Sequence, residues 1–464
     1  MIAEPWRLSA VEADRLIAAG ELSPVELTEA VLARMDEHDA CLHAFLTPTP
    51  GRAREDAKAA QARAARGARL GALDGVPHSI KDLEPTAGIR TTGGSPAARD
   101  RVPDHDSLVV ARLRATGSPL LGKTNTPNAG HKDMTDNLLG PPTRNPWNPS
   151  RTPGGSSGGA AAAVAAGLGP IAQGGDGAGS VRIPAALCGI VGVKPSTGLI
   201  PKWPSEDWYA TLATAGVLAT TVTDAAIGLA ALAGPDPRDP LCIDREPPDL
   251  VAACRGSVAG LRIAWSPDLG HARVDPAVAD LTAAGAARFG ELGAVVEEVP
   301  VGWGKLARDI IVPTWGVHFV ARFAEQAEQH PDWVDPSLVA YVRDGHRRSA
   351  LEYRRLLARR AELYDRVRRL FDSYDLLLTP TMPVTAWPAD TEPATAMFDR
   401  LPFTYPFNLT GHPAVSVPCG LDPSGLPVGL QIVAGWHRDD LAITAAARFE
   451  EAQPWPRHAP GYAA

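Results

Sequence analysis

The sequence predicts an α/β fold, in which strands and helices alternate and pack in layers. Short apolar runs rich in β-forming residues recur along the chain, and alanine-rich helical stretches separate several of them. With 464 residues, 45% of them apolar, the chain has ample material for one extended sheet, so its length does not require two domains. The predicted strands cover residues 76–82, 119–123, 169–174, 261–265, 294–300, 375–380, 414–418 and 428–434. The alanine-rich helices cover residues 160–167, 224–233 and 277–292.

Two further regions are expected to be helical. Residues 1–65 form a predicted N-terminal helical region, in which Ser23-Pro24-Val25-Glu26 matches a capping box with proline at the first helical position. Residues 300–370 contain tryptophan, arginine and histidine with weak periodicity, and we interpret them as a helical cover over the sheet. Apolar residues follow the capping box at helical spacing, at Leu27, Val31, Leu32 and Met35.

Composition argues against several classes of function. The net charge is −8 with acids and bases interleaved, and no basic stripe for nucleic acid is visible. Residues 1–6 do not resemble a signal peptide, and no apolar run has the length of a membrane span. The histidines show no zinc spacing, so no metal is expected. Five scattered cysteines suit reduced thiols in the cytoplasm: Cys41, Cys188, Cys242, Cys254 and Cys419.

Residues 151–195 form the most unusual segment, because two serines, Ser156 and Ser180, stand among glycines. Glycine lets the backbone turn sharply and lets main-chain N–H groups converge on one point. Residues 177–180 can thus present successive N–H groups to a developing oxyanion. Residues 154–157 begin an alanine-rich helix, whose first N–H groups also lack helical partners.

A nucleophilic serine needs a base, and no histidine lies in this segment. Lysine is the alternative when burial lowers its pKa enough for the amine to be neutral. Lys81 stands at the end of the apolar strand predicted at 76–82 and is therefore the candidate base.

The chain resembles the amidase-signature family, and the matching motifs follow the family's order over nearly the whole length. The long glycine-serine segment is the most specific of them. The resemblance implies one domain over residues 1–464, built as an α/β/α sandwich around a large mixed sheet. The matching motifs are the Lys81 strand, 122–127, 143–147, 154–159, 176–184, 407–411 and 425–431.

The resemblance also implies roles for individual residues. Ser180 matches the nucleophile, Lys81 the base, and Ser156 the bridging serine, which follows a cis peptide bond. The spacing from Ser180 selects Ser156 over its neighbour Ser157. The implied oxyanion donors are the N–H groups of Gly177, Ala178, Gly179 and Ser180.

Two positions depart from the family pattern without touching this triad. The family often has Thr or Ser where this chain has Gly175, and often has Gly where it has Ala178. A methyl group at position 178 restricts φ and narrows the site, but it does not block a main-chain donor. Cys188 is a weaker candidate nucleophile because it lies in an apolar run, typical of a buried structural thiol.

Residues 117–124 fit the phosphate-loop pattern GxxxxGK[ST], which requires a strand before it and a helix after it. Here residues 108–115 are predicted to form a helix, the motif itself contains a strand, and Thr124 is followed by a loop. The order is inverted, so the pattern does not favour nucleotide binding.

The other interpretation within the family is the amide-hydrolysing component of a glutamine-dependent amidotransferase. That branch carries an acidic residue for the glutamine amine near the position of Leu401, so the sequence favours a free-standing amidase. An inactive binding homologue is disfavoured by the intact triad.

The expected reaction is hydrolysis of small to medium apolar or aromatic amides through a serine acyl-enzyme, with anilides, esters and carbamates (urethanes) also accepted. Trp208, Trp303 and Trp315 are the expected substrate contacts, and the 300–370 cover is expected to shape the pocket. The expected partner is a small-molecule amide substrate. No nucleic acid, membrane or cofactor is expected, and the enzyme is expected to be a monomer or a homodimer.

Overall fold

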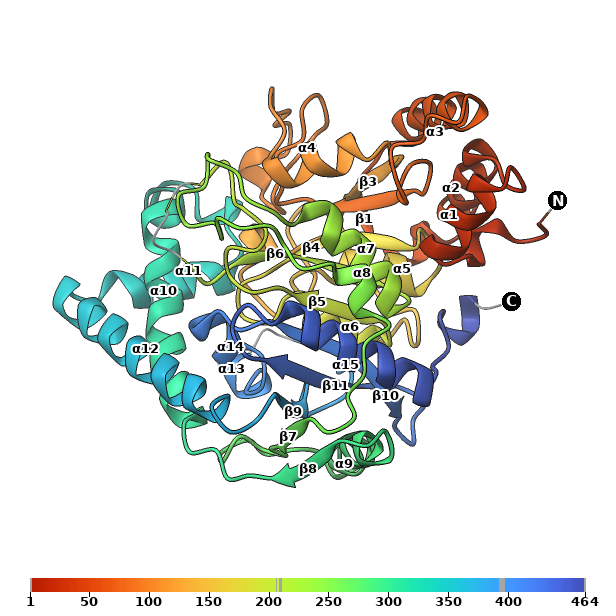
Figure 1. Ribbon diagram of the computed structural model, residues 1–464. Coiled ribbons are helices and arrows are strands. Elements are labelled where there is room, and N and C mark those ends of the chain that lie inside the picture. Colours follow the sequence, from red (N-terminus) through yellow and green to blue (C-terminus); the bar gives the residue numbers. More distant parts are fainter. Residues whose placement is uncertain (1, 206, 208–210, 392–396, 463–464) are drawn as a thin grey trace.

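A single mixed sheet forms the centre of the computed structural model, which describes residues 2–205, 207, 211–391 and 397–462 (Figure 1). Its strand order is β1-β3-β2-β4-β6-β5-β10-β11-β9-β7-β8. The strands are β1 Phe45–Pro48, β2 His78–Lys81, β3 Leu120–Thr124, β4 Ile171–Asp176, β5 Val191–Lys194, β6 Thr214–Ala219, β7 Arg262–Trp265, β8 Val295–Glu298, β9 Leu376–Pro380, β10 Ala414–Leu421 and β11 Pro427–Ala434.

All eight predicted strands are present, which confirms the α/β fold class. The sheet is mixed because β2 is parallel to both β3 and β4, and β7 is parallel to β8 and β9, whereas the remaining pairs are antiparallel. The sequence reasoning missed β1, β5 and β6. These strands are short or interrupted by glycine, and β1 ends in proline, so they lack a long β-branched run.

Helices cover the sheet, and the three alanine-rich helices lie where they were predicted, as α5, α7 and α9. Every residue of α5 is buried, because alanine and glycine let this helix sit against β4 in the interior. The helices are α1 Ala10–Ala18, α2 Pro24–Leu42, α3 Pro50–Ala65, α4 Leu108–Ala115, α5 Gly158–Ala165, α6 Arg182–Cys188, α7 Val222–Leu232, α8 Leu250–Ala253, α9 Pro276–Glu291, α10 Gly304–Gln329, α11 Pro336–His346, α12 Ala350–Leu370, α13 Met397–Arg400, α14 Tyr405–Thr410 and α15 Asp439–Ala452.

Helix α2 begins as expected, with Ser23 as its N-cap and Pro24 at the first helical position, but the predicted capping box is wrong. The Ser23 hydroxyl accepts from the Val25 N–H and donates to Gln61 Oε1, so it is turned toward α3 and not toward Glu26. A complete capping box occurs one helix earlier, at the start of α1.

The phosphate-loop pattern lies in the inverted context that the sequence indicated. Helix α4 precedes the pattern, and the last residues of the pattern, 120–124, form β3. Lys123 is buried, and its ammonium donates to Thr86 Oγ1 at 2.8 Å and Thr91 Oγ1 at 3.1 Å. The lysine that would hold a nucleotide phosphate is thus committed to the protein interior.

Helices α10, α11 and α12 lie together at one side of the molecule, opposite α1–α3 (Figure 1). Helix α10 packs against α11, α12 and α14 around an apolar cluster. It crosses α11 closely, because a Cβ on Gly345 would collide with the backbone of Gly316.

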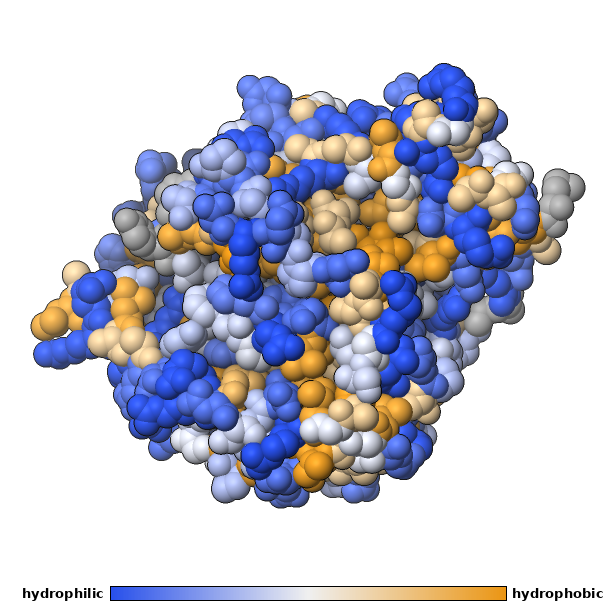
Figure 2. Space-filling view, viewed as in Figure 1, coloured by the Kyte–Doolittle hydropathy of each residue, from blue (hydrophilic) through white to orange (hydrophobic). Residues whose placement is uncertain are grey.

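The surface shown in Figure 2 is mostly hydrophilic, with apolar residues in small groups between the polar ones. Within the described ranges, none of the helices has the length and apolarity needed to cross a membrane. The five cysteines all lie in described segments and are free thiols.

Candidate active site

Lys81 is the last residue of β2, and the parallel neighbours β3 and β4 enclose its strand from both sides. Its Nζ lies 2.7 Å from Ser156 Oγ, 2.9 Å from Ser157 Oγ and 3.4 Å from the Gly175 carbonyl oxygen. The structure thus brings Lys81 and Ser156 into direct contact, although they come from separate motifs.

Burial lowers the pKa of Lys81 to about 7, against the opposing effect of the Asp176 and Glu84 carboxylates. A fully buried ammonium loses its hydration, and no carboxylate forms an ion pair with Lys81 within the described residues. A large share of the amine is therefore neutral near pH 7 and can accept a proton.

Ser156 lies in a turn just before α5, at the end of the long segment that follows β3, and the Gly155–Ser156 peptide bond is cis, which confirms that prediction. Glycine is required before it, because a Cβ on Gly155 would lie 2.7 Å from backbone atoms of Met134. The next residue, Ser157, donates its N–H to the Ser180 carbonyl at 3.1 Å. This bond ties the Ser156 turn to the loop that carries the second serine.

Ser180 lies in the loop that joins β4 to α6. Its exposed fraction is 8%, compared with 2% for Ser156 and 1% for Lys81. Among these three side chains, Ser180 is thus the one that a substrate reaches first.

Asp176 organises this loop. Its carboxylate accepts the N–H of Gly179 at 2.8 Å and the N–H of Val181 at 3.2 Å, and it forms a buried ion pair with Arg182 at 2.9 Å. Burial alone would raise the pKa of Asp176, but the guanidinium of Arg182 and the Asn408 amide hold it well below its usual range. Asp176 thus stays ionised and keeps the loop in one conformation.

The bond from Gly179 changes the expected set of oxyanion donors, because this N–H is already engaged by Asp176. Glycine at this position serves packing instead: a Cβ there would collide with Thr404, whose hydroxyl donates to the Ala178 carbonyl at 2.7 Å. The methyl group of Ala178 joins the apolar cluster beneath α10.

The three expected substrate tryptophans have different surroundings. The ring of Trp315 in α10 lies 3.6 Å from the position of a Cβ on Gly177, which places it beside the Ser180 loop. Trp303 is buried against Phe407, edge to face at 6.0 Å. Trp208 lies outside the described residues.

Residues 128–136 form part of a charged network beside the site. The sequence did not predict this network. Asp335, at the start of α11, accepts from Lys132 Nζ at 2.7 Å and lies 3.6 Å from His131 Nε2. The carbonyl of His131 accepts from Trp315 Nε1 at 3.0 Å, so the network joins α10, α11 and this loop. No local pattern pairs residues so far apart in the sequence.

The remaining candidates take no part in this cluster. Cys188 is fully buried in α6, and burial raises the pKa of its thiol well above the usual range, so it is a poor nucleophile. Leu401 is also buried, in the apolar cluster with Phe398 and Tyr405. Its neighbour Arg400 pairs with Asp133 at 2.9 Å.

Comparisons with known proteins agree on one family. The sequence model of the family described as Amidase matches residues 26–442. An acylamidase from Rhodococcus erythropolis is 40% identical, covering 97% of this chain and 96% of that protein. One component of the glutamyl-tRNA(Gln) amidotransferase of Methylococcus capsulatus is 37% identical, covering 96% of this chain and 97% of that protein.

A solved bacterial aryl acylamidase of the amidase-signature family superposes with a TM-score of 0.92 and 32% identity, covering 98% of each chain. The family match, the relatives and the fold agree with one another. The chain therefore belongs to the amidase-signature family and is an amide-hydrolysing enzyme.

Proposed function

We propose that Lys81, Ser156 and Ser180 form a catalytic triad that hydrolyses amides through an acyl-enzyme. The observation that carries the proposal is the 2.7 Å contact between Lys81 Nζ and Ser156 Oγ at a lysine whose burial favours the neutral amine. Neutral Lys81 takes the proton of Ser156, and Ser156 takes the proton of Ser180 as Ser180 Oγ attacks the carbonyl carbon. The proton returns through Ser156 to the leaving nitrogen, and water repeats the path to release the acid.

The negative charge on the attacked oxygen needs donors that are in place before the reaction. We assign this role to the N–H groups of Gly177, Ala178 and Ser180. The fourth expected donor, Gly179, instead fixes the loop through Asp176. These steps use no metal or cofactor.

We further propose that the substrates are small to medium amides with an apolar or aromatic portion, and that anilides, esters and carbamates are also cleaved. Three features support this specificity. Trp315 lies beside the Ser180 loop, and Phe319 and Phe398 contact it edge to face at 5.4 and 5.7 Å. Leu401 is buried and apolar, and the family resemblance aligns it with the acid that binds the amine of glutamine in the amidotransferase branch. Two relatives are named acylamidase and aryl acylamidase.

In this proposal the α10–α12 region, within the 300–370 cover, forms one wall of the substrate pocket of a single domain over residues 1–464. The enzyme works as a monomer or homodimer in the cytoplasm, where the five free thiols remain reduced.

The test compares kcat/KM of the purified chain on a nitroanilide, a primary aromatic amide, an aryl carbamate, acetamide and free glutamine. Trp315→Ala should raise KM for the aromatic substrates more than for acetamide, because it removes ring contacts that only the larger substrates make. Trp303→Ala is the matched control and should show no such selectivity. A preference for glutamine, or activity only with partner proteins and charged tRNA, would assign the chain to the amidotransferase branch.

A further inference from the structure

The two portions of an amide substrate must lie on different sides of the triad. In the proposed mechanism the acyl carbon is bonded to Ser180 Oγ, and Ser156 returns a proton to the leaving nitrogen. The amine portion therefore lies beside Ser156 Oγ, at hydrogen-bond distance, when the amide bond breaks. The residues on the open side of Ser156 thus decide which amines fit.

Several neighbours of Ser156 leave no path for a substrate. Lys81 and Ser157, which contact each other beside Ser156, are 1% and 0% exposed. On another side, the peptide bond before Ser156 packs against the backbone of the buried Met134. An amine cannot approach the Ser156 hydroxyl through these residues, so its place must be on another side.

Gly130 and Leu83 provide that side, because both are partly exposed. A Cβ on Gly130 would lie 3.1 Å from Ser156 Oγ and 3.0 Å from Leu83 Cδ1. The Ser156 hydroxyl and the leucine methyl group therefore flank the same point beside the bare backbone of Gly130. The φ of Gly130 is +70°, a conformation that residues with a side chain rarely adopt, so glycine keeps this passage narrow but open.

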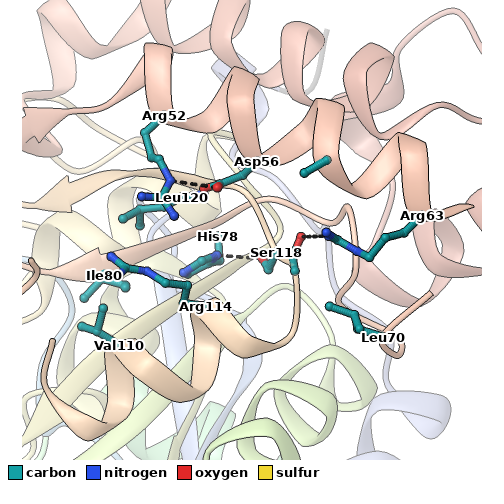
Figure 3. Close-up of a pocket in the computed structure, with 12 residues that line it drawn as sticks. Arg52, Asp56, Arg63, Leu70, His78, Ile80, Val110, Arg114, Ser118 and Leu120 are labelled. Atoms are coloured by element: carbon teal, nitrogen blue, oxygen red, sulfur yellow. Dashed lines mark hydrogen bonds and ion pairs between the residues drawn. The ribbon is translucent and has the colours of Figure 1, made fainter. Parts of the chain in front are cut away.

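The pocket between α3 and α4, shown in Figure 3, does not offer another place for the amine. His78 and Ile80 of β2 line this pocket, and because side chains alternate along a strand, Lys81 points to the opposite face. The three arginines that line it are paired with carboxylates: Arg52 with Asp56, Arg63 with Asp74 and Arg114 with Asp106. The pocket thus lies across β2 from the triad.

On the basis of the proposed function, we propose that Leu83 contacts the amine portion of the substrate and determines which amines are released fastest. Gly130 leaves room for the first substituent on the nitrogen. Leu83 presents an apolar surface, so an aniline ring gains a contact there that departing ammonia is too small to make. The enzyme therefore favours anilides over primary amides of the same acid.

Two substrates with the same acyl group test this assignment: 4-nitroacetanilide releases an aniline, and acetamide releases ammonia. Leu83→Ala should lower kcat/KM for 4-nitroacetanilide about tenfold more than for acetamide, because only the ring reaches the leucine. Leu83→Met keeps an apolar side chain of similar volume and should restore the ratio. Leu292→Ala, at a half-buried leucine that ends α9, is the matched control and should keep the original ratio.

A second pair of substrates varies the acyl portion instead. Benzamide and acetamide both release ammonia, so Leu83→Ala should change their two kcat/KM values by the same factor. Hydrolysis of the acetyl-enzyme formed from 4-nitrophenyl acetate begins after the leaving group has departed. Its rate constant should therefore change by less than about twofold in Leu83→Ala.

Each contrary result has its own meaning. An unchanged ratio of 4-nitroacetanilide to acetamide, or a loss specific to benzamide, would place Leu83 outside the amine side and overturn the proposal. Equal losses on all substrates, with slower hydrolysis of the acetyl-enzyme, would show a purely structural role and would also overturn it. Failure of the proposed function would instead appear in the unmodified enzyme, as the absence of an acyl adduct on Ser180, whatever ratios Leu83→Ala gives.

Discussion

The buried amine of Lys81 makes the rate of this enzyme depend on pH in a defined way. A lysine with an ordinary pKa of 10.5 is neutral in only about 0.03% of molecules at pH 7, whereas a pKa of about 7 makes about half of them neutral. Since the proposed base is the neutral amine, kcat/KM should rise as pH rises. The expected increase is about tenfold between pH 6 and pH 8, with a plateau above pH 8.

The assay is the initial rate on a neutral nitroanilide at substrate concentrations below KM, between about pH 5.5 and pH 9.5, so that only groups of the free enzyme titrate. Lys81→Arg tests the assignment, because a guanidinium keeps its proton over this range. The variant should lose about three or more orders of magnitude in kcat/KM and show no rise with pH. A rate in the unmodified enzyme that stays flat over this range, or that keeps rising about tenfold per unit up to the most alkaline point, would refute a base with this lowered pKa.

Two further predictions concern stability. Asp335→Asn should lower the free energy of unfolding by about 1–3 kcal/mol, because it removes one of the two carboxylates that pair with buried Lys132 and leaves Asp136 as the other. Thermal melts of the purified protein measure this, and an unchanged Tm would show that the network does not anchor α11. Burial and the nearby Asp224 carboxylate raise the pKa of Glu450 to about 7, so this group favours the folded state at low pH and loses that contribution as pH rises from about 4.5 through 7. Urea titrations at pH 5 and pH 8 measure how much unfolding free energy the protein loses between these two values. Glu450→Gln should make this loss smaller by about 2–3 kcal/mol, whereas Glu451→Gln, at an exposed residue, should leave it unchanged. Equal losses in the two variants would contradict the raised pKa of Glu450.

The sequence predicted the elements that carry strong local signals. The strand ending at Lys81 and the helix opened by residues 154–157 follow from apolar runs and alanine content, and both are present. The cis bond before Ser156 followed from the family resemblance. The strand and the helix depend on residues close together in the chain, so one sequence suffices to place them.

Other features depend on contacts that no local pattern records. The engagement of the Gly179 N–H follows from the orientation of the Asp176 carboxylate, which the buried Arg182 fixes. The bond between Asp335 and Lys132 joins a helix start to a loop that lies 203 positions earlier in the chain. Three strands were missed because they are short or interrupted by glycine, so that pairing with neighbouring strands defines them more than their own residues do.

Intact-protein mass spectrometry can show whether Ser180 carries the acyl group. An activated aryl ester mixed with the enzyme and quenched within milliseconds should give one acyl adduct per chain, and peptide mapping should place it on Ser180. Ser180→Ala should give no adduct and no turnover, while Ser156→Ala should acylate several orders of magnitude more slowly at the same residue. An adduct on Ser157 or Cys188, or near-normal turnover by folded Ser180→Ala, would show that Ser180 is not the nucleophile.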